Sequence, residues 1–364
     1  MNTLIPLEYY GAFYYYFLLM VVLAVFIQSG AQSIDNSANL KIKRNLGIFL
    51  VYFVLIYMGT RPLSGRYFGD MRTYSVRYLG YAAGQELFVG KDIFFDYFMK
   101  FCSSIMSVEM FFLICSALYV YPLYLASKKM FEGYWFYCFL MIVISMSFWS
   151  YGTNGIRNGI ATSFFTYAIT RERPLYKYLW MLLAVAFHQS LIIPIIAYFI
   201  SIKFNKTSLY FKLWLITIPL SIILGSFWEG FFMNLGLFET ERAEGYLTGG
   251  EEFAEQFSST GFRWDFLLYS ATGTFAGWYF IIKKKFQDPL YSHIFNVYLI
   301  CNAFWILVIR ATFSNRFAYL SWFLLGIVII YPLLKNRFFL KQHNVVAKVT
   351  FVYFLFTFLL NVFL

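Results

Sequence analysis

Four short groups of polar residues carry the side chains that could do chemistry in this otherwise apolar chain. The first group occupies residues 61–77 and contains Arg61, Arg66, Asp70, Tyr74 and Arg77. If it is helical, the last four of these share one face, because residues three and four apart are neighbours on a helix. Arginine grips phosphate through a planar fork of donors. The group therefore predicts a phosphate clamp with Asp70 as a candidate general base; the alternative is a loop held by ion pairs.

The second group, residues 152–159, opens an apolar run and contains Asn154, Arg157 and Asn158. On a helix these three residues share a face with Ala161. The start of a helix binds anions through unpaired backbone amides and the helix dipole. An arginine at a membrane-embedded helix start is costly enough to suggest a function. We expect Arg157 and Asn158 to bind a diphosphate; the alternative is a purely structural role.

The third group centres on His188, one of three histidines in the chain, with Gln189 and Ser190 beside it. A neutral imidazole can orient a substrate hydroxyl or accept its proton. His188 is thus a candidate catalytic residue, and Ser190 is a candidate substrate contact. The alternative is that this histidine packs against an apolar face with its hydrogen bonds satisfied.

The fourth group contains Arg310, Arg316 and Tyr319 near the start of another apolar run. Tyr319 follows Arg316 by about one helical turn, so the two side chains lie on one face. These residues predict a second contribution to substrate binding. The alternative is that the arginines snorkel to the membrane interface.

The elements that must hold these groups are membrane-spanning helices. Of the 364 residues, 60% are hydrophobic and only 13% are charged, whereas an ordinary soluble domain is about 25% charged. About 20 apolar residues cross the hydrocarbon layer as a helix. We expect an amphipathic, interfacial stretch at residues 92–106 and spans near residues 9–29, 45–60, 107–127, 133–150, 155–170, 211–230, 263–282, 291–309, 315–334 and 346–364.

Lysine-rich clusters indicate the orientation of these spans. Six such clusters hold 18 of the 29 Lys and Arg residues, and the positive-inside rule assigns them to the cytoplasmic side. We therefore attribute the net charge of +11 to membrane orientation and expect no nucleic-acid partner. All six clusters fall on one side only if residues 176–200 form a hairpin with His188 at its tip. Both termini then lie outside, with two large outer loops at residues 60–91 and 230–262.

The basic residues outside these clusters are mostly arginine, nine of eleven. Arginine on the outer side opposes the positive-inside rule, and phosphate binding would explain why arginine occurs there. The alternative is that these arginines pair with outer carboxylates, which are Asp70, Asp92, Asp96 and the acidic residues of 239–255.

No zinc-spaced cluster and no glycine-rich phosphate motif occurs in the sequence, and the four cysteines lie in apolar stretches. We therefore expect neither a metal nor a cofactor. The expected fold is a single all-α transmembrane domain, residues 1–364, of about 12 transmembrane or re-entrant helices.

Taken in this order, the four groups resemble the EpsG family of exopolysaccharide polymerases, which are Wzy-like. The likeness covers about residues 61–334. The family usually has a Gln-like residue where this chain has Asn158 and a Lys-like residue where it has Gln189. The motifs that carry the resemblance are residues 61–74 with Gly69-Asp70, Gly155-Ile156-Arg157-Asn158-Gly159-Ile160-Ala161, Ala186-Phe187-His188-Gln189-Ser190-Leu191-Ile192 and Asn315-Arg316-Phe317-Ala318-Tyr319.

The resemblance implies a Wzy-like or GT-C-like architecture and glycosyl transfer between two undecaprenyl-diphosphate-linked oligosaccharides, a donor and an acceptor. The acceptor hydroxyl attacks the anomeric carbon of the growing chain, and undecaprenyl diphosphate leaves. On this hypothesis Arg157, Arg316 and Arg66 hold the diphosphate. Either Asp70 or His188 activates the hydroxyl, and the sequence leaves that choice open. The implied setting is the bacterial inner membrane, with the lipid bilayer and a chain-length regulator as partners and the active site facing the periplasm.

Three other functions fit parts of the pattern. An O-antigen ligase would share the outer arginines and the lipid diphosphate but would transfer a finished polymer to a core lipid. A membrane acyltransferase would place its histidine near cytoplasmic basic residues, whereas His188 groups with outer arginines. A flippase or other transporter would show symmetry between its halves, which the sequence lacks. Products distinguish them: a ladder of lengths marks a polymerase, a single addition a ligase, and movement without bond formation a flippase.

Overall fold

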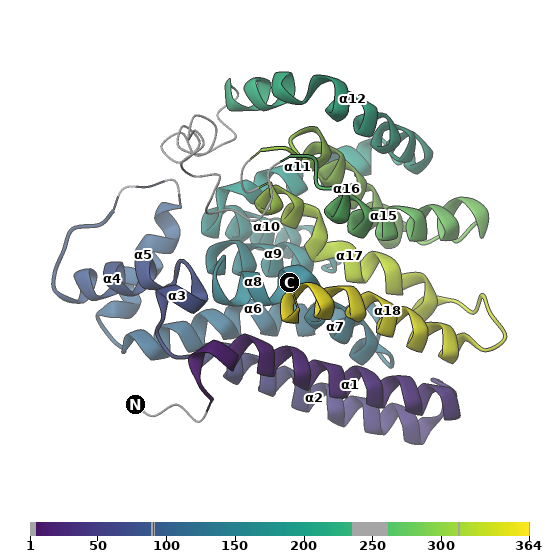
Figure 1. The fold of residues 1–364 in the computed structure, drawn as a ribbon, viewed down its shortest axis with the longest axis horizontal. Helices are drawn as coiled ribbons and strands as arrows, with labels where there is room; N and C mark the ends of the chain where they lie inside the picture. Colours follow the sequence, from purple (N-terminus) through teal and green to yellow (C-terminus); the bar gives the residue numbers. More distant parts are fainter. Residues whose placement is uncertain (1–4, 89, 91, 235–260, 312–313, 364) are drawn as a thin grey trace. The chain divides into compact units, whose positions relative to one another are not determined.

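The computed structural model describes residues 5–88, 90, 92–234, 261–311 and 314–363, and every regular element among these residues is a helix (Figure 1). The chain divides into two compact units. The first unit comprises Met1–Leu191 and Leu333–Leu364, and the second comprises Ile192–Pro332.

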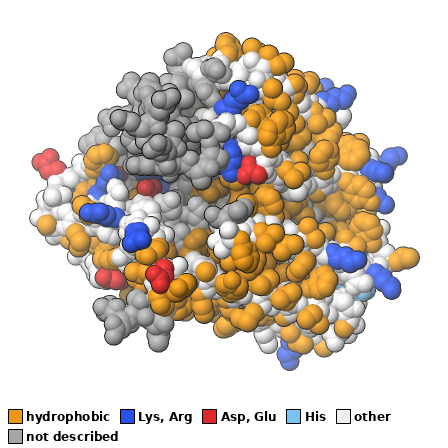
Figure 2. All heavy atoms as spheres, viewed as in Figure 1, with side chains coloured by type: hydrophobic (Ala, Val, Ile, Leu, Met, Phe, Trp, Pro, Cys, Tyr) orange, Lys and Arg blue, Asp and Glu red, His pale blue; other side chains and the backbone are white. Residues whose placement is uncertain are grey.

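Seven helices among the described residues are long and apolar enough to cross a membrane, which confirms the prediction of an all-helical, polytopic membrane protein. Figure 2 shows apolar side chains covering much of the visible face, as contact with lipid requires. The seven candidate spans are Leu7–Ala31, Ser37–Gly59, Val108–Met130, Thr207–Gly225, Pro289–Leu307, Asn315–Lys335 and Gln342–Val362.

The expected count of about 12 helices that enter the membrane is not confirmed, because some expected spans are short, broken or absent from the candidate spans. Helix α9 (Ile156–Ile169) has 14 residues. At 1.5 Å per residue it reaches about 20 Å, whereas the hydrocarbon core is about 30 Å thick. Helix α15 (Trp264–Trp278) continues directly into the π-helical turn η3 (Tyr279–Lys283), so its length is close to that of the expected span at residues 263–282, but it is not among the candidate spans.

The expected span at residues 133–150 is two helices, α7 (Trp135–Val143) and α8 (Met146–Thr153), which meet at an angle of 69°. The backbone of Ser145 is extended at the bend, and its hydroxyl donates to the carbonyl of Ile142. All nine residues of α7 are buried, so this helix is surrounded by protein. The bend directs the chain to the loop from which α9 starts.

In the first unit, helices pack in pairs, and α6 connects α2 to α9. Helix α1 (Tyr10–Ala31) packs on α18 (Gln342–Val362), and α2 (Ser37–Gly59) packs on α6 (Val108–Met130), which in turn packs on α9. Glycines permit the close contacts, as is common between membrane helices. A Cβ added at Gly59 would lie 2.8 Å from Leu113 Cα, and one at Gly159 would lie 2.7 Å from the carbonyl oxygen of Tyr151.

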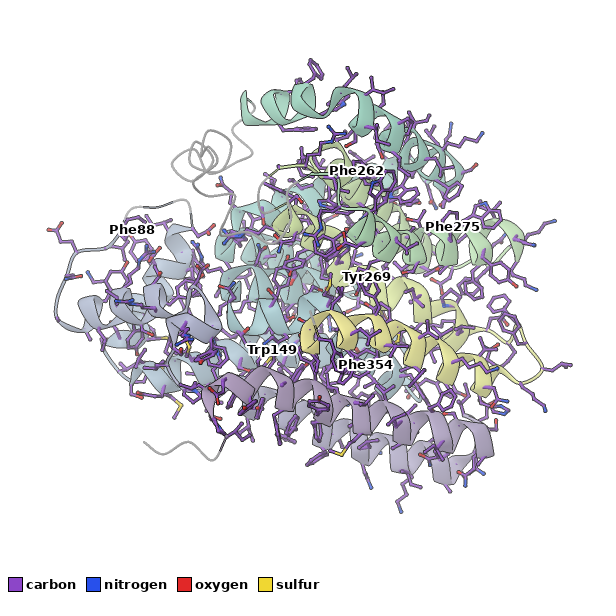
Figure 3. All side chains as sticks on the ribbon, viewed as in Figure 1. Phe88, Trp149, Phe262, Tyr269, Phe275 and Phe354 are labelled. Carbon is purple, nitrogen blue, oxygen red and sulfur yellow. The ribbon has the colours of Figure 1, made fainter. Side chains whose placement is uncertain are left out.

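Aromatic side chains fill the space between these helices. The ring of Trp149 lies 4.4 Å from that of Tyr14 and 6.2 Å from that of Tyr57, so α8 is wedged against α1 and α2 (Figure 3). Such pairs add about 0.5–1.5 kcal/mol to the burial of the rings. Helix α8 is thereby fixed, and with it the loop that precedes α9.

The expected outer loop at residues 60–91 contains two helices, α3 (Gly65–Phe68) and α4 (Met71–Ala82). The prediction of one helical face from Arg66 to Arg77 is wrong, because the chain turns at Gly69, whose φ is +52°. A Cβ there would overlap the side chain of Asn154, so the turn depends on glycine. Arg66 belongs to α3, while Tyr74 and Arg77 belong to α4.

Helix α5 (Ile93–Ser103) has the amphipathic character that the sequence predicts. Its buried face carries Phe95, Asp96, Met99 and Cys102. It packs against α4, α6 and α10 (Pro174–Phe187). The other expected outer loop, residues 230–262, lies almost entirely outside the described residues.

The second unit contains α11 (Ile192–Lys203), α12 (Thr207–Asn234), α15, α16 (Pro289–Leu307) and most of α17 (Asn315–Lys335). Helices α11, α12 and α15 each pack against α16. Buried polar side chains join them: Trp214 Nε1 donates to Asn302 Oδ1 at 2.7 Å, and Asn302 Nδ2 donates to Ser321 Oγ at 2.9 Å.

Candidate active site

A buried carboxylate, Asp92, is the centre of the densest group of charged side chains among the described residues of the first unit. It precedes α5 and is 3% exposed. Its Oδ2 accepts hydrogen bonds from Arg157 Nη1 and His188 Nδ1, both at 2.7 Å, and its Oδ1 accepts the backbone N–H of Gln189 at 3.0 Å. Burial raises the pKa of Asp92, but the hydrogen bond and charge of His188, the charge of Arg157 and the amide of Gln189 outweigh it and lower the pKa overall. Asp92 is therefore ionised at neutral pH.

Arg157 is held from two sides at the start of α9. Gly155 is the residue before the helix, so Arg157 lies in the first turn, as predicted. Its Nε donates to the hydroxyl of Tyr74 at 3.1 Å while Nη1 donates to Asp92. Tyr74 comes from α4, and burial raises its pKa. The guanidinium thus links α9 to α4 and to the start of α5.

His188 lies at a break between two short helices. Its extended backbone ends α10 and begins the 3₁₀ turn η2 (Gln189–Leu191), after which α11 follows. This break excludes one continuous helix over residues 176–200. A carboxylate can only accept, so Nδ1 carries the proton in the bond to Asp92. In the neutral form of the ring, Nε2 would then be the acceptor. The side chain of His188 is 18% exposed.

A second contact joins the same two segments of chain. Ser190 Oγ donates to Asn158 Oδ1 at 3.2 Å. Asn158 follows Arg157 directly on α9, and Ser190 lies two residues after His188. The structure therefore brings the second and third groups of the sequence together. We call Tyr74, Asp92, Arg157, Asn158, His188 and Ser190 the Asp92 cluster.

Asp70 adjoins this cluster through its backbone. Its N–H donates to Asn154 Oδ1 at 2.8 Å, two residues before α9 begins. The negative charge of Asp70 is among the influences that raise the pKa of Tyr74, after burial and against the opposing effect of Arg157. Asp70 is therefore within electrostatic reach of the cluster.

Arg61 is part of the supporting structure. It is 4% exposed, and it donates to the backbone carbonyls of Met58 at 2.5 Å and Thr153 at 3.1 Å. Burial lowers the pKa of Arg61 to about 10, so it stays charged. It ties the end of α2 to the end of α8. Arg66, by contrast, is exposed on α3, with its guanidinium 5.4 Å from the ring of Tyr67.

The residues of the fourth group belong to the second unit. Arg316 is exposed in the first turn of α17, as the sequence predicts, and Tyr319 follows it with its ring 5.5 Å from that of Trp322. Arg310 is exposed and donates to the carbonyl of Ile222 at 3.3 Å.

The sequence predicts Asp92 only as one of several carboxylates that could pair with an outer arginine, and for Arg157 this alternative is the arrangement found. Asp96, one turn later on α5, pairs with Arg77 at 3.1 Å in the same way. A signal was available: the spacing of four residues puts both aspartates on one face of α5, and Asp96 falls among buried apolar residues. A buried aspartate on an amphipathic helix needs a partner.

The fold and the cluster define a class: a polytopic membrane protein in which polar and charged side chains from α4, the residue before α5, α9 and the α10–η2 junction meet in a largely buried group. The family model of the EpsG family matches residues 45–364. The chain therefore belongs to the EpsG family, a Wzy-like polymerase family of bacterial membrane proteins. Searches of curated proteins and of solved structures found no significant match.

Proposed function

We propose that this protein is a polysaccharide polymerase that transfers a growing undecaprenyl-diphosphate-linked glycan onto the next lipid-linked repeat at the outer face of the inner membrane. Membership of the EpsG family supports the class of reaction. The observation that supports the site is the hydrogen bond between His188 Nδ1 and the ionised, buried Asp92, beside Arg157 at the start of α9.

The proposed reaction joins two glycans and releases a lipid diphosphate. The acceptor hydroxyl attacks the anomeric carbon of the donor, and the bond from that carbon to the diphosphate oxygen breaks. His188 Nε2 takes the hydroxyl proton, and undecaprenyl diphosphate leaves with the electron pair. Asp92 holds the ring in the required tautomer and stabilises the imidazolium that forms. Asp70 was the other candidate base; His188 is favoured because Asp92 already fixes its tautomer.

The developing negative charge of the leaving diphosphate requires fixed positive charge. We assign this role to Arg157 with the backbone amides at the start of α9, together with Arg66 on the exposed helix α3. Diphosphate binding by Arg316 is a separate proposal for the second unit. Because Asp92 and Tyr74 already hold Arg157 Nη1 and Nε, we expect its guanidinium to act in a fixed orientation. Further substrate contacts are proposed for Asn158, Ser190, Arg310 and Tyr319. The bilayer and a chain-length regulator are the proposed partners.

Reconstitution tests this function. The purified protein would be placed in proteoliposomes with lipid-linked repeats taken from host cells that lack the gene, and products would be separated by size. We expect a ladder of polymer lengths. A single addition would indicate a ligase, and transport of repeats without bond formation would indicate a flippase.

Substitution of Arg157 by lysine tests the site, because it keeps the charge and removes the fork. We expect shorter polymer and lower yield from Arg157→Lys. Arg171→Lys is the matched control: Arg171 lies just beyond the other end of α9 and donates to the hydroxyl of Tyr167 at 2.7 Å, as Arg157 does to Tyr74. Unchanged polymer from Arg157→Lys would remove this residue from the proposed site.

A further inference from the structure

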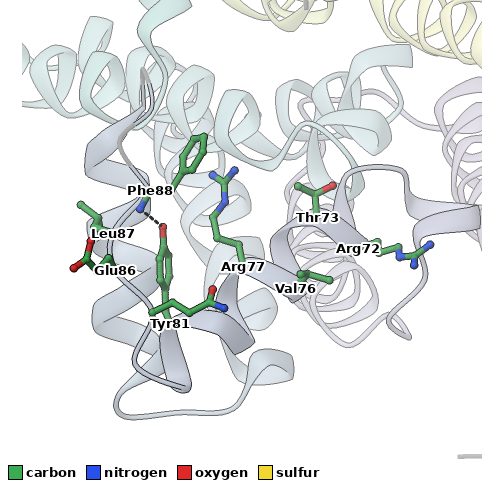
Figure 4. A pocket seen from close by; sticks show the side chains of 9 residues that line it. Arg72, Thr73, Val76, Arg77, Tyr81, Glu86, Leu87 and Phe88 are labelled. Atoms are coloured by element: carbon green, nitrogen blue, oxygen red, sulfur yellow. Dashed lines mark hydrogen bonds between the residues drawn. The ribbon is translucent and has the colours of Figure 1, made fainter. Parts of the chain in front are cut away.

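A groove on the first unit lies beside the Asp92 cluster and is lined by none of the cluster's residues. Helix α4 and the segment that follows it form this open groove of about 670 Å³ (Figure 4). The lining combines two aromatic rings with side chains that bear planar polar groups. Its principal residues are Arg72, Arg77, Tyr81, Gln85, Glu86 and Phe88.

Hydrogen bonds hold the groove in shape. The hydroxyl of Tyr81 accepts the backbone N–H of Phe88 at 3.1 Å (Figure 4). The same hydroxyl donates to Asp96 Oδ1 at 2.9 Å. Lys100 Nζ donates to the carbonyl of Gln85 at 3.2 Å. The segment is thereby attached to both α4 and α5, so a ligand would meet walls that are already formed. Such preorganisation lowers the entropic cost of binding.

The ring of Phe88 offers an exposed aromatic surface. Phe88 is 51% exposed, although an isolated phenylalanine loses free energy by facing water. The guanidinium of Arg77 lies 4.1 Å from the ring centroid, which fixes the ring by a cation–π contact. An aromatic face packs against the C–H groups of a sugar ring, while amide, carboxylate and guanidinium groups bind its hydroxyls.

The charge of the groove argues against a phosphate ligand. Arg77 forms an ion pair with the buried Asp96 at 3.1 Å. The two exposed charges that remain in the lining, Arg72 and Glu86, have opposite signs. A phosphate site needs excess positive charge and bidentate donors, whereas a glycan needs neither.

The groove and the cluster share two helices. Tyr74, which contacts Arg157, and Arg77, which lines the groove, are three residues apart on α4. Asp92 and Asp96 are four residues apart at the start of α5. Neighbours at this spacing are roughly 5–6 Å apart. A glycan whose reacting end lies at the Asp92 cluster would reach the groove within about one helical turn.

We propose that this groove binds the sugar residues of the lipid-linked repeat next to the bond being formed, with Phe88 as the stacking platform. The proposal rests on the function proposed above. It makes Phe88 a determinant of which repeat is accepted, with the chemistry of the reaction left to the Asp92 cluster.

Tryptophan fluorescence tests binding without requiring polymerisation. Oligosaccharides released by mild acid from the host strain's own polymer would be titrated into the detergent-purified Phe88→Trp variant. We expect a saturable emission change beyond that of the wild type. Phe101→Trp is the control, because Phe101 is 64% exposed on α5 and does not line the groove; it should not respond.

Kinetics in proteoliposomes give a second readout. Loss of a stacking contact worth about 1.4 kcal/mol raises KM about tenfold, so Phe88→Ala should raise KM for the lipid-linked repeat by about that factor with kcat within threefold of wild type. Phe88→Tyr should restore KM.

The outcomes separate the two proposals. A fluorescence response with no ladder from any variant would keep the groove and discard the polymerase. A normal ladder with unchanged KM in Phe88→Ala and no response in Phe88→Trp would discard the groove and keep the polymerase. A response of Phe88→Trp to anionic phospholipid vesicles and not to oligosaccharide would identify a lipid-surface contact and overturn the proposal.

Discussion

Substitution of Asp92 by asparagine is the sharpest perturbation of the cluster, because it preserves shape and changes only the hydrogen-bonding pattern. Asp92 Oδ2 accepts from Arg157 and His188, and Oδ1 accepts from the amide of Gln189. An asparagine has one oxygen and one NH₂ group. Whichever way the amide is oriented, its NH₂ faces groups that donate in the wild type.

The magnitude follows from the bonds that are lost. A hydrogen bond to a charged group contributes about 1.5–3 kcal/mol, and breaking a buried ion pair from one side costs about 3–5 kcal/mol. With two charged bonds meeting at Oδ2, we expect the free energy of unfolding to fall by about 3–5 kcal/mol. An NH₂ group facing Nδ1 of His188 also favours the tautomer with the proton on Nε2. In that tautomer Nε2 already carries a proton and cannot take one from the acceptor hydroxyl, so the rate should fall by the contribution of a general base, about 10²–10⁴-fold.

The assay is the initial rate of polymer formation in proteoliposomes, measured beside thermal unfolding of the same preparations. Asp35→Asn is the control: Asp35 accepts from Arg337 and from Tyr134 in the same unit, but its side chain is 52% exposed, and we expect its rate within twofold of wild type. The double variant Asp92→Asn with His188→Gln should be no slower than His188→Gln alone. A wild-type rate in folded Asp92→Asn, or two effects that multiply, would refute the role of this pair.

Three further expectations follow from particular residues. The pKa of Asp92 is lowered in the folded protein. Its ionised carboxylate therefore stabilises the fold above the unfolded pKa of about 3.9, and this stabilisation is lost as pH falls through the folded pKa. The difference in melting temperature between wild type and Asp92→Asn should shrink below about pH 4; a difference that grows would contradict this. In thermal melts Gly69→Ala should destabilise the protein more than Gly84→Ala does. Both glycines have positive φ, but only at Gly69 would a Cβ meet a side chain, that of Asn154, and such overpacking costs about 1–3 kcal/mol; equal destabilisation by the two variants would contradict this. Arg61→Met should lower the melting temperature without changing KM for the lipid-linked repeat, because Arg61 bonds only backbone carbonyls in the contacts above; a raised KM at unchanged stability would make it a substrate ligand.

The sequence predicted features that depend on a single stretch of chain. Long apolar runs specify α1, α6 and α18, because the hydrocarbon thickness sets their length. Glycine before Arg157 specifies the helix start, and the polar residues at His188 specify the break between α10 and η2. In each case the neighbouring residues contain the determinant.

Features that depend on distant residues could not be predicted. Asp92 and Arg157 are 65 positions apart, and nothing local selects one arginine among the nine outside the lysine clusters. The turn at Gly69 is fixed by Asn154, whose side chain accepts the amide of Asp70 84 positions away. The same holds for the bend at Ser145, which lies inside an apolar run that alone would form one span.

The central claim is that the Asp92 cluster catalyses formation of a glycosidic bond with release of a lipid diphosphate. The most direct measurement counts undecaprenyl diphosphate released against glycosidic bonds formed in proteoliposomes that contain wild type or His188→Gln. We expect one diphosphate per bond in the wild type, and a loss of both in folded His188→Gln. Release that continues unchanged in His188→Gln, or movement of repeats with no diphosphate released, would contradict the claim.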